Sequence, residues 1–242
     1  MPDPEAKVAL LAGASGLVGG HVLGALLAAP EFTRIYAITR RPLGREHARL
    51  ANRIVQFERL EEQLKGTSCH TAFCCLGTTL KAGDEDELHA VELDYVVSFA
   101  RAARAAGAQR FVMLSCAGAD VGSRNPHYRV KAQAEQAVVA LGFPALDILQ
   151  PGALLGMRRE FRPGDIARGL TLPLMNVLLT GSREPRRAIP AREVAAAMLG
   201  VTRSGRRGTN RYTYAAIRAQ ALVKPIKALQ PPPSKSSQRR RG

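Results

Sequence analysis

The sequence predicts an α/β protein with a doubly wound, mostly parallel sheet and a small C-terminal substrate lobe. Short apolar runs alternate with helix-length segments over the first 150 residues, which is typical of βαβ units. The first apolar run leads directly into a glycine-rich turn and then a helical segment. The chain has 242 residues, of which 46% are hydrophobic, and this is enough for one large domain with a sizeable core.

The expected elements follow from periodicity. Strands are expected at residues 8–12, 34–39, 53–57, 71–76, 110–115 and 145–150. Helices are expected at residues 20–29, 84–106 and 128–141, and the last two end at Gly107 and at Gly142, where glycine can form the C-terminal cap.

The pattern loosens after Gln150. Proline and glycine interrupt short apolar segments between residues 151 and 200, as expected of a lobe that covers a substrate. From residue 224 onward the chain is basic and has little apolar content. We therefore expect one domain over residues 1–223, with a substrate lobe from residues 151–200, and a disordered basic tail over residues 224–242.

Charge and cysteine content exclude several classes of protein. Eleven of the 35 basic residues lie in residues 201–242, which contain no acid, so the net charge of +15 belongs mostly to the C-terminal end. We expect weak phosphate attraction there and no specific nucleic-acid binding. Four cysteines without a second pair at ligand spacing indicate neither a disulfide framework nor a metal site. No apolar stretch is long enough for a membrane span, and no leader is evident, so we expect a soluble, cytoplasmic protein.

The first glycine-rich turn is the strongest motif. A strand ending at Ala12 continues as Gly13-x-x-Gly16-x-x-Gly19 and then as a helix. Gly13 permits the tight turn, Gly16 lets backbone amides approach a pyrophosphate, and Gly19 brings the helix close to the strand. The motif predicts a Rossmann-type dinucleotide site.

The end of the second strand indicates which dinucleotide binds. The strand ends in Arg40 and Arg41, where a site for NAD(H) usually has an acid. Guanidinium groups suit a 2′-phosphate, so NADP(H) is preferred over NAD(H). The alternative is that one or both arginines face solvent.

The chain resembles the atypical short-chain dehydrogenases/reductases, in the branch typified by the Tat-interacting oxidoreductase, with an NAD(P)-binding, NAD-dependent epimerase/dehydratase-like core. The resemblance covers roughly residues 8–200. Besides the glycine turn, it rests on Ala72-Phe-Cys-Cys-Leu-Gly77-Thr78-Thr79, Lys81-Ala-Gly83, Asp94-Tyr95-Val96, Leu114-Ser115, Gly118-Ala119-Asp120, Val130-Lys131 and Pro151-Gly-Ala-Leu-Leu155.

This resemblance implies roles for particular residues. Ser115, Tyr128 and Lys131 are the implied catalytic residues. Those implied to bind the cofactor are Gly13, Ala14, Ser15, Gly16, Leu17, Val18, Arg40, Arg41, Leu76, Gly77, Thr78, Thr79, Lys131, Pro151 and Gly152.

The catalytic acid departs from the family pattern. In the family a tyrosine lies four residues before the lysine, but here His127 holds that place and Tyr128 lies three residues before Lys131. On a helix, one residue corresponds to a rotation of about 100°. The helix could begin after Pro126 and let Tyr128 reach the substrate, His127 could act as the acid, or the site could lack a conventional acid. We favour Tyr128.

Two functions remain open. One is an NADP(H)-dependent oxidoreductase that transfers a hydride to or from a small carbonyl or alcohol. The alternative is an NADPH-sensing regulatory or protein-interaction module with little or no turnover. We expect a small-molecule substrate, and leave open a homodimer that pairs through the helix at residues 84–106, or a protein partner.

Overall fold

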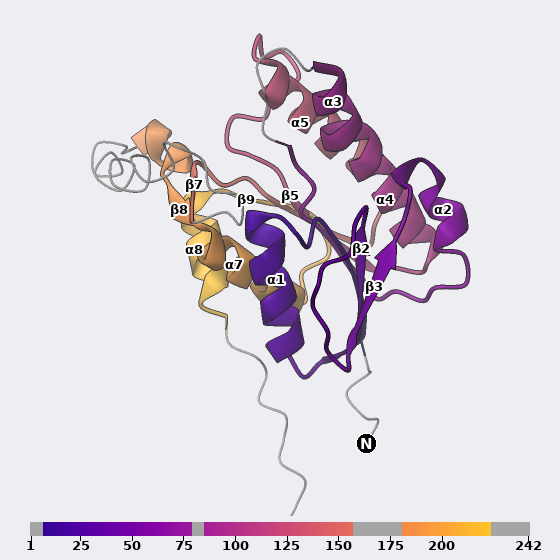
Figure 1. Ribbon diagram of the computed structural model, residues 1–242. Helices are drawn as coiled ribbons and strands as arrows, with labels where there is room; N and C mark the ends of the chain where they lie inside the picture. The colour runs from indigo at the N-terminus through magenta and orange to yellow at the C-terminus, as the bar shows by residue number, and fades with distance from the viewer. Residues whose placement is uncertain (1–6, 79–84, 157–180, 224–242) are drawn as a thin grey trace, which may run out of the picture.

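The computed structural model describes residues 7–78, 85–156 and 181–223. Its centre is a parallel seven-stranded sheet in the order β3-β2-β1-β4-β5-β6-β9 (Figure 1). The strands are β1 (Lys7–Ala12), β2 (Phe32–Thr39), β3 (Leu50–Ile54), β4 (Thr71–Cys74), β5 (Arg110–Leu114), β6 (Ala145–Leu149) and β9 (Gly208–Tyr212). The chain crosses over between β3 and β4, because β1 and β4 pair in parallel with Ala9 opposite Thr71. The predicted doubly wound sheet is confirmed.

Helices cover both faces of this sheet (Figure 1). On one face lie α1 (Leu17–Ala28), α7 (Ala191–Arg203) and α8 (Tyr214–Ala221), and on the other lie α2 (Leu60–Gln63), α4 (Tyr95–Ala105) and α5 (Pro126–Ala140). Alternate residues of a strand point to opposite faces, so Leu11 of β1 packs with the α1 side and Leu10 with the α4 side. Both faces are buried, which explains the continuous apolar runs in the sequence.

Some expected elements differ in their bounds. The strand expected at residues 53–57 is β3 at Leu50–Ile54, and Phe57 begins a short 3₁₀ helix, η1 (Phe57–Arg59). The helix expected at residues 84–106 is interrupted: α3 (Glu85–His89) is followed by a π-helical turn, η2 (Ala90–Asp94), and then by α4.

The expected lobe is only partly separate from the body. In residues 151–200, β7 (Leu154–Leu155) pairs with β8 (Ile189–Pro190) as a small second sheet, next to the 3₁₀ helix η3 (Gly181–Arg186). In contrast, α7 packs against α1 in the main core, where Val194 and Met198 share a cluster with Val22. Part of the segment expected to form the lobe thus belongs to the main core.

The structure also contains a strand that the sequence analysis does not predict. Strand β9 has a polar sequence, in which only Tyr212 of the five residues is buried. The predicted tail at 224–242 lies outside the described residues, as does the part of the lobe at 157–180. Within the described ranges, no helix is sufficiently long and apolar to cross a membrane.

Candidate cofactor and substrate site

A cavity of about 1330 Å³ lies at the carboxyl ends of the central strands, where ligands bind in open parallel sheets. Its walls come from the segments that follow β1, β2, β4, β5 and β6, and from η2 and α5. The sequence-predicted residues that line it are Ala14, Ser15, Gly16, Leu17, Val18, Leu76, Gly77, Thr78, Ser115, Lys131, Pro151 and Gly152. The structure thus brings most of the predicted site together.

The glycine turn has the backbone geometry that a dinucleotide requires. Gly13 has φ +82°, and a Cβ there would lie 2.4 Å from the carbonyl oxygen of Cys75. A Cβ on Gly19 would lie 2.0 Å from the carbonyl oxygen of Gly13, so α1 can approach the turn only with glycine at that position. Gly16 is the N-cap of α1 and provides no side-chain hydrogen bond to the first turn, which leaves backbone amides facing the cavity. An uncapped helix N-terminus that opens into a cavity fits a pyrophosphate.

Lys131 is held in an ion pair that the sequence does not reveal. Its Nζ lies 2.5 Å from Oε2 of Glu92, and the exposed fractions of the two side chains are 7% and 1%. The same ammonium donates to the carbonyl oxygen of Leu114 at 3.3 Å. Oε1 of Glu92 accepts from the backbone amide of Thr78 at 2.8 Å. Glu92 therefore joins the loop after β4 to the lysine on α5.

Ser115 is also paired with a carboxylate. Its Oγ donates to Oε1 of Glu135 over 2.5 Å, and both side chains are buried. Gln150 donates to the same oxygen at 2.8 Å, and Arg211 lies 3.3 Å from the other one. Because the only hydroxyl proton of Ser115 points to Glu135, its oxygen presents lone pairs to the cavity.

The structure separates the two candidate acids. Asn125 caps α5 by accepting from the amide of His127 at 2.9 Å, and Pro126 takes the first helical position. The helix thus begins at Pro126, which excludes a start after that residue, and His127 and Lys131 share one face at i and i+4.

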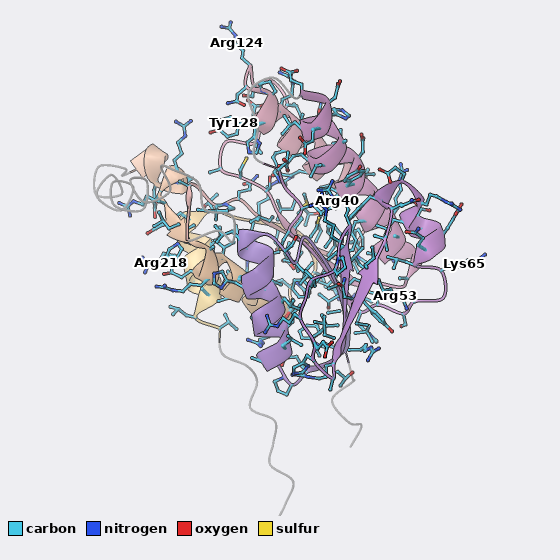
Figure 2. All side chains as sticks on the ribbon, viewed as in Figure 1. Arg40, Arg53, Lys65, Arg124, Tyr128 and Arg218 are labelled. Atoms are coloured by element: carbon cyan, nitrogen blue, oxygen red, sulfur yellow. The ribbon has the colours of Figure 1, made fainter. Side chains whose placement is uncertain are left out.

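His127 lines the cavity, whereas Tyr128 does not and is 37% exposed. Figure 2 shows Tyr128 at the N-terminal end of α5, where its ring faces Gly118 of the preceding loop. The structure therefore places His127, and not Tyr128, in the lining of the cavity. Burial lowers the pKa of His127, Glu92 raises it and Lys131 lowers it further. The Asn125-Pro126 pair was the sequence signal that could have located the start of this helix.

The predicted phosphate-binding arginines lie at the edge of the site. Arg40 and Arg41 are exposed and are absent from the cavity lining, whereas Arg45, in the same loop, lines it. The hydroxyl of Tyr95 donates to Glu58 at 2.7 Å, and this hydrogen bond lowers the pKa of Glu58 and raises that of Tyr95. The charge of Arg40 has a smaller, lowering effect on both groups. Arg40 is labelled in Figure 2. Thr79 lies outside the described residues.

Two further features complete the walls. A Cβ on Gly152 would lie 2.4 Å from the carbonyl oxygen of Arg187, so the chain after β6 packs directly on the segment that leads to β8. Cys116 also lines the cavity, and burial raises the pKa of its thiol to about 11, so it is a neutral group at pH 7.

The sequence of this chain is similar to those of several known proteins. The protein HTATIP2 of Rattus norvegicus is 37% identical over 163 residues, which cover 66% of this chain and 67% of the relative. The mitochondrial protein FMP52 of Saccharomyces cerevisiae is 34% identical over 169 residues, covering 68% and 73% of the two chains. The mitochondrial protein fmp52 of Emericella nidulans is 38% identical over 168 residues, covering 66% and 72%. No family model matches the chain.

The mitochondrial names of these fungal relatives overturn the prediction of a cytoplasmic protein.

Solved structures support the fold. MoeE5 in complex with UDP-glucose and NAD has a TM-score of 0.64 at 18% identity, covering 85% of this chain and 75% of that one. UDP-glucose 4-epimerase from Thermotoga maritima with UDP-glucose has a TM-score of 0.65 at 13% identity, covering 85% and 76%. At these identities the likeness is one of fold.

Proposed function

Because this chain belongs to the atypical short-chain dehydrogenases/reductases, in the branch of HTATIP2 and FMP52, we propose that it is an NADP(H)-dependent oxidoreductase acting on a small alcohol or carbonyl. One observation carries the proposal. A single cavity runs from the backbone amides at the start of α1 to Ser115, His127 and Lys131. A dinucleotide on the amides would therefore share its space with groups that can bind an oxygen and move a proton.

The residues around the cavity fit a nicotinamide dinucleotide. The amides of residues 14–18, except that of Gly16, which donates to Gly13, would hold the pyrophosphate. The loop at 76–78 would line the nucleotide, and Pro151 and Gly152 would lie beside the nicotinamide. When bound, the cofactor supplies hydride transfer. MoeE5, which shares the fold, holds NAD in its solved complex, and this supports a dinucleotide of the same class.

The preference for NADP(H) rests on three guanidinium groups in one loop. Arg45 lines the cavity, and Arg40 and Arg41 are exposed beside it. A 2′-phosphate can accept bidentate hydrogen bonds from such groups. Arg45, which the sequence did not single out, is the one best placed to make them.

His127 would exchange the proton of the reaction. It lines the cavity one helical turn before Lys131, in the place that the family gives to its tyrosine. Its lowered pKa makes the imidazole neutral at pH 7, so it can accept the proton of an alcohol. The proton would pass from the substrate hydroxyl to the ring, and the hydride of the carbinol carbon would go to the oxidised cofactor as the carbonyl bond forms.

Ser115 would contact the substrate beside the reacting hydroxyl. With its own proton donated to Glu135, its oxygen can accept a hydrogen bond from a further polar group of the substrate, while the reacting hydroxyl keeps its single proton for His127. A neutral His127 acting as a base suits an alcohol as the bound reduced substrate. We therefore propose alcohol oxidation as the direction favoured at neutral pH.

The position of Tyr128 outside the cavity lining favours a second candidate function. A site without the family's phenol in reach of the cavity would also suit an NADPH-sensing module with little turnover. Tight cofactor binding without hydride transfer to any substrate would support this second function.

A turnover assay with matched variants tests the proposal. The purified full chain would be supplied with NADP⁺ and a panel of small primary and secondary alcohols, and NADPH formation would be followed by absorbance. His127→Asn should lose turnover by about 100-fold or more, because general-base catalysis contributes that much, and should keep its cofactor affinity. Tyr128→Phe, on the same helical turn, should retain most of the wild-type turnover. Loss in Tyr128→Phe with retention in His127→Asn would contradict the assignment.

A further inference from the structure

The π-helical turn η2 places a carboxylate where a regular helix would not. Over Ala90–Asp94 the helix is locally wider, and Glu92 in its centre is only 1% exposed. Such turns within α-helices occur frequently at functional sites, because they change which side chains face inward. A buried acid is costly unless it is paired, so the position of Glu92 requires an explanation from its contacts.

Those contacts join two walls of the cavity. Glu92 lines the cavity, accepts from the amide of Thr78 at 2.8 Å, and pairs with Lys131 at 2.5 Å. A Cβ on Gly77 would lie 3.3 Å from Oε1 of Glu92, so the loop after β4 packs closely on the carboxylate. The pair is therefore fixed in place beside the cavity and shielded from water.

The charge of this pair matters for the neighbouring imidazole. A lysine assists a tyrosine acid because its positive charge favours the phenolate. The same charge opposes a histidine, which becomes positive when it takes a proton. A carboxylate bound to the lysine cancels most of that field, because two opposite charges 2.5 Å apart act at a distance nearly as a neutral unit.

We propose that Glu92 is a positioning residue which neutralises Lys131 beside His127, so that the imidazole can accept the substrate proton while the lysine remains available to the cofactor. The inference rests on the proposed function, since it concerns the base of that reaction. It explains two departures together: a histidine replaces the phenol, and the lysine is bound to a buried acid.

The groups around His127 agree with this assignment. The charges that act on it come from Glu92 of η2 and Lys131 of α5, in opposite directions. The ring of Tyr128 lies 5.9 Å away between centroids, and Cys116, which also lines the cavity, has a pKa raised by burial to about 11 and is neutral at pH 7. Asp120, in the loop before α5, directs its carboxylate to the amide of Gly122 at 3.0 Å.

A titration of His127 by NMR in four proteins tests the proposal. The full-length wild type, Glu92→Gln, Lys131→Met and the double variant would be labelled in their imidazole rings, and the His127 signal would be assigned by its loss in His127→Asn. The pKa of His127 should fall in Glu92→Gln, rise in Lys131→Met and return close to the wild-type value in the double variant. Glu135→Gln, which removes a different buried carboxylate, on α5 itself, is the control and should leave this pKa unchanged.

The pattern of the four titrations decides the outcome. A general loosening of the fold would move both single variants in the same direction, and such a result would overturn the proposal, as would an unchanged pKa in both. Thermal unfolding curves would establish that each variant is folded at the temperature of the titration. The titration needs no turnover, so it can fail while the oxidoreductase assay succeeds, and a failed assay with the expected titration would reject only the proposed function.

Discussion

The hydroxyl of Ser115 donates to the carboxylate of Glu135, with 2.5 Å between Oγ and Oε1. Glu135 lies one helical turn after Lys131 on α5 and is 5% exposed. Gln150, directly after β6, and Arg211 of β9 hold the same carboxylate. The serine at the end of β5 is therefore oriented by a buried network rather than by a phenol.

Glu135→Gln should lower the rate of substrate turnover without changing the affinity for the cofactor. The change removes a charge-assisted hydrogen bond to Ser115, which is worth about 1.5–3 kcal/mol, and lets the hydroxyl adopt other orientations. We expect a decrease in kcat/KM for the alcohol of about tenfold or more, measured at saturating NADP⁺. Calorimetry should find the same Kd for NADPH as in the wild type. An unchanged kcat/KM would mean that Glu135 serves only the packing of α5.

Ser115→Ala should lower turnover more strongly. The substrate then loses one hydrogen-bond acceptor, while Glu135 keeps its bonds to Gln150 and Arg211 and the fold is preserved. We expect a decrease in kcat of about 100-fold with little change in NADPH affinity, from steady-state kinetics and calorimetry. Lys131→Ala should reduce both turnover and NADPH affinity. Full activity of both variants on every substrate of the panel would reject the catalytic assignment.

The pH dependence follows from the titration of His127. Burial lowers the pKa of its imidazole from the ordinary value near 6.5. Alcohol oxidation needs the neutral ring, so its rate should rise with pH only below that value and stay level near pH 7. Carbonyl reduction needs the charged ring, so its rate should fall as pH rises through the same range. A rate that changes near pH 10 instead would indicate a phenol and contradict the role of His127.

Arg45→Ala should weaken the binding of NADPH more than the binding of NADH. The variant removes the guanidinium that lines the cavity in the loop after β2. We expect the Kd of NADPH to rise about tenfold, the effect of one charged hydrogen bond, with little change for NADH. Arg59→Ala, which changes an exposed arginine paired with Glu62 on the surface, is the matched control. Equal losses for both coenzymes would show that Arg45 does not contact a 2′-phosphate.

Asp147→Asn should destabilise the sheet at its β9 edge. Asp147 is fully buried, pairs with Arg110 and accepts from the hydroxyl of Tyr212 at 2.9 Å. Loss of its charge leaves the largely buried Arg110 without its partner, which costs about 3 kcal/mol. Chemical denaturation should show this decrease in the free energy of unfolding, whereas Tyr212→Phe should cost about 1 kcal/mol. A cost below that of Tyr212→Phe would contradict a stabilising ion pair.

The glycine turn and the presence of the first six strands of the sheet could be predicted from the sequence, because each depends on local pattern. Gly13 and Gly16 lie where a tight turn and a helix start must be. Glu92 and Glu135 could not be found in this way, since an acid on a helix normally indicates a solvated face. The π-turn shifts the helical phase at Glu92, and this shift depends on packing between η2 and α5.

The choice between His127 and Tyr128 depended on a single helix boundary. A sequence pattern places a helix end only to within a few residues, and one residue decides which side chain shares a face with Lys131. Strand β9 was not predicted, for a different reason. Its sequence is polar, and it pairs with β6 at an exposed edge, so its register comes from tertiary contacts such as Tyr212 with Asp147.

Parallel calorimetric titration of the wild-type protein with NADPH and NADH tests the central claim most directly. Saturable binding of NADPH, at about one molecule per chain and more tightly than NADH, is the predicted result. The absence of heat with either coenzyme, on material that unfolds cooperatively, would contradict a dinucleotide site at the start of α1 and every step built on it.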